Sequence, residues 1–270
     1  MSKPQILLTN DDGIQSHGLW AAAESLSKLG FVHVAAPREQ SSAAGRSMPG
    51  TSDGRIETRQ VIVDGKEWTV HAVGGTPAQT VLHALLEILP ERPQLVVAGI
   101  NYGENVGSGV TISGTVGAAM EAATLGVPAI AISLQVEPRH HYSLSDEVDF
   151  STAAYFAAYF GRLMLNKKLP DDVDVLKVEV PCNASPETPW VVTRLSRLRY
   201  YEPMPPERRD WSKPARVGYQ ITPQLDQEDA LTDVYAVGAR GWVSVTPLSL
   251  DLTSRVELAA LDELLRADQT

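Results

Sequence analysis

Short, unbroken runs of apolar residues alternate with helical patterns along the first two-thirds of the chain. The runs are continuous rather than alternately apolar and polar, which is typical of strands in a parallel sheet that is covered on both faces. They occupy residues 6–8, 31–36, 95–100, 129–133 and 173–180. The helical patterns between them occupy residues 18–29, 76–89, 113–125 and 150–165. This repeated strand–helix order predicts an α/β fold with a doubly wound, mostly parallel sheet.

Turn-forming residues mark several boundaries of these predicted elements. An Asp-Gly pair at 64–65 lies between two strand-like runs, 55–63 and 67–73, and this pair is a strong signal for a tight hairpin. The dipeptide Thr76-Pro77 predicts a helix start, with the threonine as N-cap. We expect Gly30 to close the first helix.

The character of the sequence changes after the predicted α/β core, residues 1–183. Residues 184–224 are rich in proline and arginine and follow no clear period. Residues 241–247 read as a strand, and Thr253 is placed to cap a final helix. The appendage at 184–270 is therefore predicted to pack on the core and to build an oligomer interface, with a lid as the alternative.

Two adjacent carboxylates, Asp11 and Asp12, follow directly after the first apolar run. In open α/β sheets, ligands bind just beyond the carboxyl ends of the strands. Neighbouring side chains of a strand point to opposite faces, so both carboxylates can serve one site only if the chain leaves the strand, which Gly13 permits. Two carboxylates held together repel each other, and a divalent cation would relieve the repulsion. The pair predicts a metal site; the alternative is an Asx-type turn with two solvated aspartates.

Other oxygen-bearing side chains follow two further strands. Ser41 and Ser42 lie in the loop after the second apolar run, and Asn101 ends the third run. The chain contains no CxxC and no HExxH sequence, which disfavours zinc, whereas oxygen ligands favour Mg²⁺, Mn²⁺ or Ca²⁺. The segment Ser113 to Thr115 precedes a helix, where hydroxyl and backbone N–H groups can bind an anion. A plain helix cap is the commoner role of such residues.

Composition narrows the class of partner. The chain has 270 residues and a net charge of −10, which argues against a nucleic-acid polymer or an anionic membrane because both require basic surface. No segment approaches the about 20 apolar residues of a membrane span, and the first residues do not read as a signal peptide. The single cysteine, Cys182, fits a reducing compartment, so we expect a cytoplasmic protein. The first strand–helix turn also lacks the GxGxxG pattern of dinucleotide-binding folds.

Six segments of the chain resemble the SurE family of bacterial survival proteins, in order and over nearly the whole length. They are ILLTNDDGI (6–14), APREQSSAAGRS (36–47), GGTPA (74–78), AGINYGENVG (98–107), SGTVGAAMEAA (113–123) and GWVSVTPLSLDLT (241–253). The resemblance implies a Rossmann-like α/β core with a C-terminal arm that exchanges between the subunits of a homodimer or homotetramer. It also implies a metal-dependent 5′(3′)-nucleotidase that releases phosphate from nucleoside monophosphates, with short polyphosphate as a further substrate of some members.

The same resemblance assigns the residues of the site. The implied metal ligands are Asp11, Asp12, Ser42 and Asn101, with Ser41 as the alternative to Ser42. They would hold one divalent ion per subunit, Mg²⁺ or Mn²⁺, with Ca²⁺ as an occupant in crystals. The implied phosphate pocket is formed by Asn105, Ser113, Gly114 and Thr115. The chain departs from the family pattern at residues 108–112, which lack the expected acidic and aromatic residues, and at Gln79-Thr80, where Asp-Cys is usual. These departures concern substrate preference rather than the metal site.

The implied reaction is in-line attack of water on phosphorus. A bound metal would act as a Lewis acid, Asp12 or Asn10 would orient the water, and Ser113 with its neighbours would stabilise charge on the phosphoryl oxygens. His17 is the nearest histidine in the chain, but it reads as a surface residue at a helix start. The region of Asp233 reads as approaching either the site or a subunit boundary.

Two other functions stay open at this point. A nucleotide sensor would use the same pocket to bind a monophosphate without hydrolysing it. A sugar-nucleotide enzyme would hold a nucleotide diphosphate sugar through a metal, and it would need a larger second lobe than residues 184–270 supply.

Overall fold

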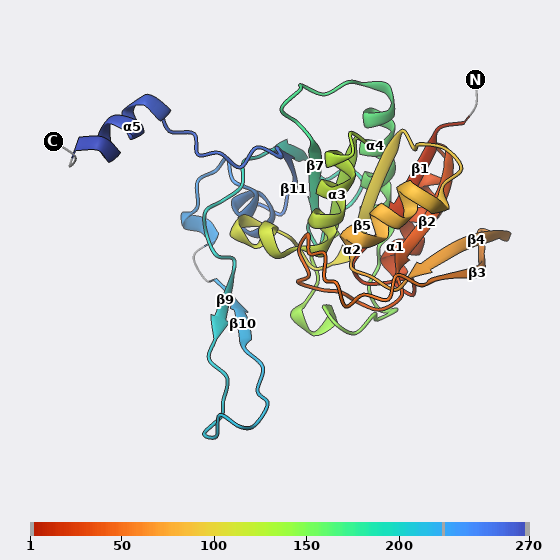
Figure 1. Cartoon of the computed structure of the whole chain (residues 1–270), viewed down its shortest axis with the longest axis horizontal. Coiled ribbons are helices and arrows are strands. Elements are labelled where there is room, and N and C mark those ends of the chain that lie inside the picture. The colour runs from red at the N-terminus through yellow and green to blue at the C-terminus, as the bar shows by residue number, and fades with distance from the viewer. Residues whose placement is uncertain (1–2, 223–224, 268–270) are drawn as a thin grey trace.

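The computed structural model describes residues 3–222 and 225–267, and it consists of one large sheet between two helical layers (Figure 1). Within these residues the sheet has nine strands in the order β3-β4-β2-β1-β5-β6-β7-β11-β8. Its strands are β1 (Gln5–Thr9), β2 (Phe31–Pro37), β3 (Ile56–Val63), β4 (Lys66–Val73), β5 (Leu95–Tyr102), β6 (Ala129–Leu134), β7 (Val175–Val180), β8 (Trp190–Val192) and β11 (Val243–Leu248). The α-helices are α1 (His17–Leu26), α2 (Pro77–His83), α3 (Gly114–Thr124), α4 (Ser151–Asn166) and α5 (Leu258–Arg266). The predicted doubly wound α/β fold is confirmed.

The central strands are parallel, and the chain reverses its direction of winding at β1. Strand β1 pairs with β2 on one side and with β5 on the other, and β6 and β7 continue the parallel sheet beyond β5. The carboxyl ends of β1 and β5 therefore lie side by side at a topological switch point. Open α/β sheets bind their ligands at this place.

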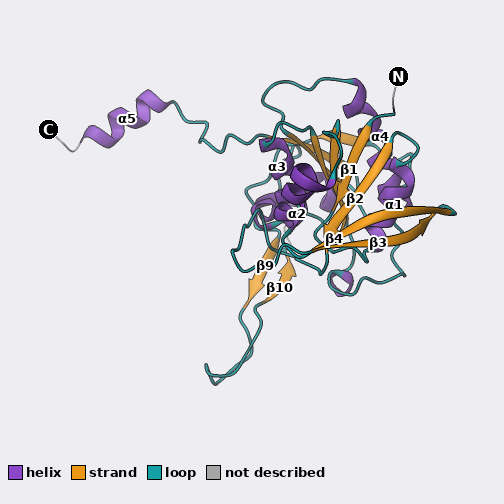
Figure 2. Ribbon diagram, turned by 45° about the vertical axis from the view of Figure 1, so that its right-hand side comes forward, coloured by secondary structure: helices purple, strands orange, loops and turns teal. Residues whose placement is uncertain are grey.

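Two separate apolar cores cover the two faces of the sheet. Figure 2 shows the sheet and its helices from a second direction. Helices α1 and α4 pack together on one face, and α2 and α3 pack together on the other. Ile6 and Leu8 point into the first core and Leu7 into the second, and all three are fully buried. The unbroken apolar runs arise because both faces of these strands are covered.

Local signals placed some boundaries and missed others. Thr76 caps α2 as predicted, and its partner in the capping box is Gln79, one of the two residues that depart from the family pattern. The helical pattern up to residue 89 is α2 followed by a π-turn, Ala84–Ile88. Helix α1 ends at Leu26, so the prediction that Gly30 closes it is wrong. Gly30 instead packs so closely on the Pro4 carbonyl that a Cβ would lie 2.3 Å from its oxygen.

The C-terminal third contributes to the main sheet as well as projecting from it. Strand β11 runs antiparallel to β7 and parallel to β8, so these residues extend the core sheet. The hairpin β9–β10 (Tyr201–Met204 and Gly218–Ile221) and helix α5 extend away from the body (Figures 1 and 2). The prediction that Thr253 caps α5 is wrong: Thr253 donates its backbone N–H to Asp251, and the helix begins five residues later, at Leu258. Within the described part of the chain, no helix has the length and apolar character to cross a bilayer.

Candidate active site at the switch point

The acidic turn after β1 leaves the strand in the way the sequence predicts. The Asn10 amide group closes the turn: its Nδ2 donates to the Gly13 carbonyl at 3.0 Å, and its Oδ1 accepts from the Gly13 N–H at 3.1 Å. Gly13 has a φ of 92°, a conformation that side-chain-bearing residues rarely adopt. The turn places Asp11 and Asp12 at the edge of the sheet rather than on its two opposite faces. Both polar ends of the Asn10 side chain are used in building it, and its predicted role in orienting water stays a prediction.

Asp11 is held against the start of α3. Its Oδ1 accepts a hydrogen bond from the Thr115 hydroxyl, and its backbone carbonyl accepts from the Ser41 N–H at 2.7 Å. A Cβ on Gly114 would lie 2.7 Å from the Asp11 Cβ and 2.8 Å from its Oδ2. Only glycine allows this approach, which brings the N-terminus of α3 beside the carboxylate.

Asp12 is held by residues from two other segments. Its Oδ2 accepts from the Tyr102 N–H at the end of β5, 3.1 Å away, and its Oδ1 accepts from Gln40 Nε2 at 3.0 Å. The same Gln40 amide nitrogen donates to the His141 carbonyl at 3.0 Å. Gln40 therefore joins the acidic turn to the loop after β6. Sequence reasoning missed Gln40, because a glutamine in a variable polar loop carries no distinguishing pattern.

The pKa values of the two carboxyl groups, Asp11 and Asp12, are raised above their usual range. Asp11 is 3% exposed and Asp12 is 1% exposed. Burial raises the pKa of Asp11 to about 6, although the Thr115 hydroxyl and nearby backbone N–H groups offset part of this. Burial and the charge of Asp11 raise the pKa of Asp12 well above its usual value. Among the described residues, no lysine or arginine forms an ion pair with either aspartate. The site thus has an excess of negative charge, which a divalent cation would balance.

Neutral oxygen atoms complete the predicted ligand set. Asn101 donates through Nδ2 to the Gly103 carbonyl at 2.6 Å, which leaves its Oδ1 as the free end of the amide. The Ser41 hydroxyl contacts the Glu39 carbonyl at 3.5 Å, whereas the Ser42 hydroxyl has no hydrogen bond within the described chain. Over the same residues, no group of three or more His, Cys, Asp or Glu side chains could hold a metal. Two carboxylates with neutral oxygens fit a hard divalent cation such as Mg²⁺.

Two of the predicted phosphate-binding residues, Gly114 and Thr115, lie next to Asp11. Ser113 caps α3 by accepting from the Val116 N–H at 3.1 Å, so its hydroxyl has the plain capping role. The Thr115 hydroxyl is turned toward Asp11. The first backbone N–H groups of a helix have no partner within it. Those of Gly114 and Thr115 hydrogen-bond to the Asp11 carboxylate and lower its pKa, and their predicted role in binding phosphate stays a prediction. Asn105 is half-buried in the loop after β5, where its amide donates to the Ser133 hydroxyl at 3.1 Å.

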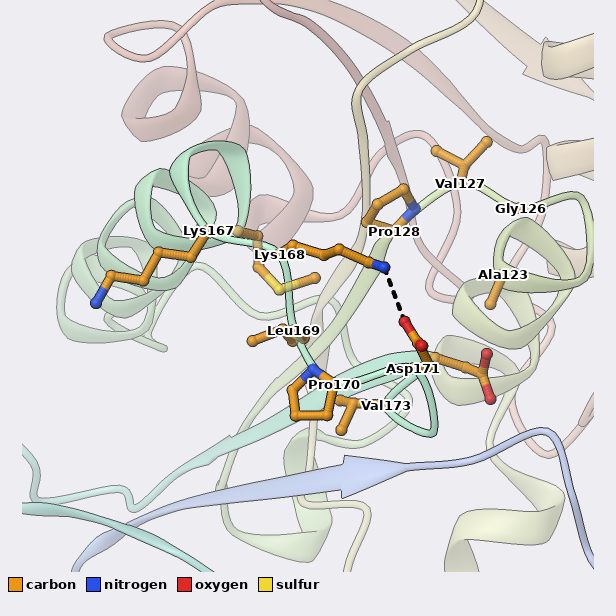
Figure 3. A pocket seen from close by; sticks show the side chains of 12 residues that line it. Ala123, Gly126, Val127, Pro128, Lys167, Lys168, Leu169, Pro170, Asp171 and Val173 are labelled. Carbon is orange, nitrogen blue, oxygen red and sulfur yellow. Dashed lines mark ion pairs between the residues drawn. The ribbon is translucent and has the colours of Figure 1, made fainter.

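Other candidate positions lie elsewhere. His17 is exposed at the first residue of α1, as its position in the sequence indicated. The cavity drawn in Figure 3 is lined by residues that precede β6 and β7, so it lies at the opposite edge of the sheet from the acidic turn. Its charged residues include the ion pair between Lys168 and Asp171.

Comparison with known proteins agrees with the resemblance found in the sequence. The family model described as "Survival protein SurE" matches residues 6–202. A Thermococcus kodakarensis protein named 5′-nucleotidase SurE is 43% identical over 97% of this chain and 99% of its own length. An Archaeoglobus fulgidus protein of the same name is 44% identical over 94% of each chain. The crystal structure of the SurE protein from Aquifex aeolicus has 31% identity and a TM-score of 0.76, over 99% of this chain and 100% of its own. The chain belongs to the SurE family.

Proposed function

We propose that this chain is a divalent-metal-dependent nucleotidase that hydrolyses nucleoside 5′-monophosphates to nucleoside and phosphate. The observation that carries the proposal is the pair of buried carboxylates, Asp11 and Asp12, beside the N-terminus of α3 at the switch point of the sheet. The relatives named 5′-nucleotidase match nearly the full chain, which supports the choice of substrate. We also propose 3′-monophosphates and short polyphosphate as further substrates.

The proposed metal ligands are Asp11, Asp12, Ser42 and Asn101. Ser42 is preferred to Ser41 because its hydroxyl is free of the backbone contact that Ser41 makes with Glu39. When bound, one Mg²⁺ or Mn²⁺ per subunit would polarise a phosphoryl oxygen as a Lewis acid and balance the charge of the two carboxylates. Ca²⁺ has the same preference for oxygen ligands and would occupy the site in crystals.

The chain's own residues supply the other requirements of in-line phosphoryl transfer. The N–H groups of Gly114 and Thr115, which also donate to the Asp11 carboxylate, would bind the phosphoryl oxygens together with the dipole of α3 and stabilise the charge that these oxygens gain. Asn105 would donate to the same group. Tyr102 N–H and Gln40 fix the Asp12 carboxylate, which would orient the attacking water. The Ser113 hydroxyl contributes by fixing the start of α3.

Phosphate release tests the proposal directly. The purified chain is treated with a chelator, and AMP, GMP, 3′-AMP and tripolyphosphate are then supplied with Mg²⁺ or Mn²⁺ restored. Release from the monophosphates only when metal is restored supports the nucleotidase. Absence of release with either metal, together with a thermal shift on adding AMP, supports the nucleotide sensor instead. Turnover that requires a nucleotide diphosphate sugar supports the sugar-nucleotide enzyme.

We propose that the C-terminal arm forms a homodimer or homotetramer. Helix α5 lies away from the body of the molecule (Figure 1). It carries four leucines that are exposed within the described chain: Leu258, Leu261, Leu264 and Leu265. The β9–β10 hairpin carries Trp211, which is 90% exposed, in the loop at its tip. Apolar side chains presented in this way favour burial against another copy of the chain. Sedimentation of the full chain against a form ending at residue 250 tests the assignment.

The single cysteine and the nucleotide substrate also favour a cytoplasmic location.

A further inference from the structure

A charged cluster lies buried directly behind the predicted phosphate-binding residue Asn105. Lys177 and Glu179 lie two residues apart on β7, and Asp233 comes from the C-terminal third; all three are 0% exposed. Lys177 Nζ lies 3.1 Å from Asp233 Oδ2 and 3.4 Å from Glu179 Oε1. The sequence predicts that Asp233 approaches either the site or a subunit boundary; the structure buries it completely, in contact with Lys177. The sequence of β7 contains a signal for Lys177 and Glu179, since these two charged residues interrupt one face of an otherwise apolar buried strand.

The cluster holds Asn105 at three points. Lys177 Nζ donates to the Asn105 carbonyl at 2.9 Å, and the Asn105 N–H donates to Glu179 Oε2 at 2.8 Å. The Asn105 side-chain Nδ2 donates to the Ser133 hydroxyl at 3.1 Å, and that hydroxyl donates to Glu179 Oε1 at 3.4 Å. These bonds engage the backbone and one amide proton of Asn105. They leave its Oδ1 and its second amide proton for a ligand.

Asp233 ties the same loop to the C-terminal third. Its Oδ2 accepts from the Gly107 N–H at 3.0 Å as well as from Lys177, and its Oδ1 accepts from the Ser196 and Val234 N–H groups at 2.9 Å each. The loop after β5 is therefore attached to β7 and to the segment after β8 through one carboxylate.

Simple stabilisation does not account for this cluster. Removing three charged groups from water carries a penalty that their mutual attraction often fails to repay, and apolar residues of similar volume frequently stabilise a protein equally well. Within the described residues, the side-chain hydrogen bonds of Lys177 and Glu179 lead instead to Asn105, to Ser133, to Asp233 or to each other. The geometry thus fixes the position of one loop residue more than it strengthens the core.

We propose that Lys177, Glu179 and Asp233, acting through the Ser133 hydroxyl, are positioning residues that orient the Asn105 amide toward the phosphoryl group. This inference rests on the proposed phosphate-transfer function. None of the four touches the substrate; they act on the reaction only through Asn105. A displacement of about 1 Å in a phosphate-binding group lowers turnover by as much as about 100-fold, so a rigid support behind Asn105 has a direct effect on rate.

A double-mutant cycle between Ser133 and Asn105 tests the inference. Ser133→Ala removes only the hydroxyl that accepts from the Asn105 amide, and it leaves Asp11, Asp12 and Asn101 unchanged. We expect kcat/KM for AMP to fall about tenfold and Mg²⁺ affinity to stay the same, because contacting residues of one network couple. In an Asn105→Ala background, the same Ser133→Ala change should cost less than twofold. Glu179→Gln should show the same loss and the same dependence on Asn105.

Ser25→Ala is the matched control. Ser25 is a half-buried serine on α1, and its hydroxyl donates to the Ala154 carbonyl at 2.7 Å rather than to any residue of the cluster. This change should leave kcat/KM within twofold of the wild type. Equal losses from Ser133→Ala with and without Asn105 would overturn the inference, because a merely structural hydroxyl acts independently of Asn105.

A second measurement separates failure of the inference from failure of the proposed function. The affinity of the Mg²⁺-loaded protein for inorganic phosphate is measured by calorimetry for the same four proteins of the cycle. If wild type binds phosphate but does not turn over AMP, the nucleotidase proposal fails, and coupling in phosphate affinity still decides the role of Ser133. If wild type neither binds phosphate nor turns over AMP, both proposals are refuted.

Discussion

Replacing Asp11 with asparagine should stabilise the metal-free protein while abolishing turnover. Burial raises the pKa of the Asp11 carboxyl from 3.8 to about 6. At neutral pH this difference makes the ionised carboxylate about 3 kcal/mol less favourable in the folded chain than in the unfolded chain. Asparagine has nearly the same shape and keeps an oxygen that can accept from the Thr115 hydroxyl. The substitution therefore removes most of the cost of the buried charge, and with it one ligand of the proposed metal.

The expected pH dependence follows from the direction of the pKa change. The folded state holds the Asp11 proton more tightly than the unfolded state, so the stability of the metal-free wild type falls as pH rises from 3.8 to about 6. The advantage of the variant should be about 3 kcal/mol near pH 7.5 and roughly half of that near pH 5. In a chain of this size, about 3 kcal/mol corresponds to a rise in Tm of roughly 5–10 °C.

Calorimetry in the presence of a chelator measures this difference, and phosphate release from AMP with Mg²⁺ restored measures the loss of activity. Mg²⁺ at about 100 times its Kd should stabilise the wild type by about 2.7 kcal/mol and leave the variant unchanged. Asp171→Asn is the control, because it also removes one negative charge, from an exposed ion pair at the opposite edge of the sheet (Figure 3). A variant that melts at or below the wild-type temperature in chelator, or that keeps metal-restored turnover, would refute the reasoning.

Gly114→Ala should reduce turnover at least tenfold and destabilise the chain by about 1–3 kcal/mol, because the new Cβ would overlap Asp11. Gly109→Ala serves as the control in the same assays, because a Cβ at that position meets nothing within 4 Å. Mg²⁺ competes with protons for the carboxylates, so titration calorimetry should find that the Mg²⁺ affinity falls about tenfold for each pH unit below about 6, the pKa of Asp11. A Mg²⁺ affinity that does not change between pH 7 and about pH 5 would contradict Asp11 as a ligand. Thr76→Ala should lower stability by about 1 kcal/mol through loss of the α2 cap, with no change in Mg²⁺ affinity; a wild-type denaturant midpoint would show that the cap contributes nothing.

Several features of the fold were predictable because their causes are local. The continuous apolar runs required strands covered on both faces, and the helical patterns between them required crossovers, so the doubly wound sheet followed. The turn at Asn10 to Gly13 was equally readable, since a glycine after two carboxylates lets the chain leave the strand. Where local signals competed, prediction failed. Thr253 is a good cap by residue type, but the residues after it are not helical, and α5 begins only at Leu258.

The composition of the site depended on contacts between segments far apart in the sequence. The sequence by itself establishes an α/β chain with oxygen-bearing side chains at the ends of strands. It does so because the spacing of buried residues and the residue types of turns are both visible within a few neighbouring residues. The tertiary structure alone decides that β1 and β5 are neighbours, so that Tyr102 meets Asp12, and that Gln40 reaches the same carboxylate. It also brings Asp233 from 56 residues along the chain to Lys177. Such pairings are selected by which apolar faces the whole chain can bury at once, and no short stretch of sequence contains that information.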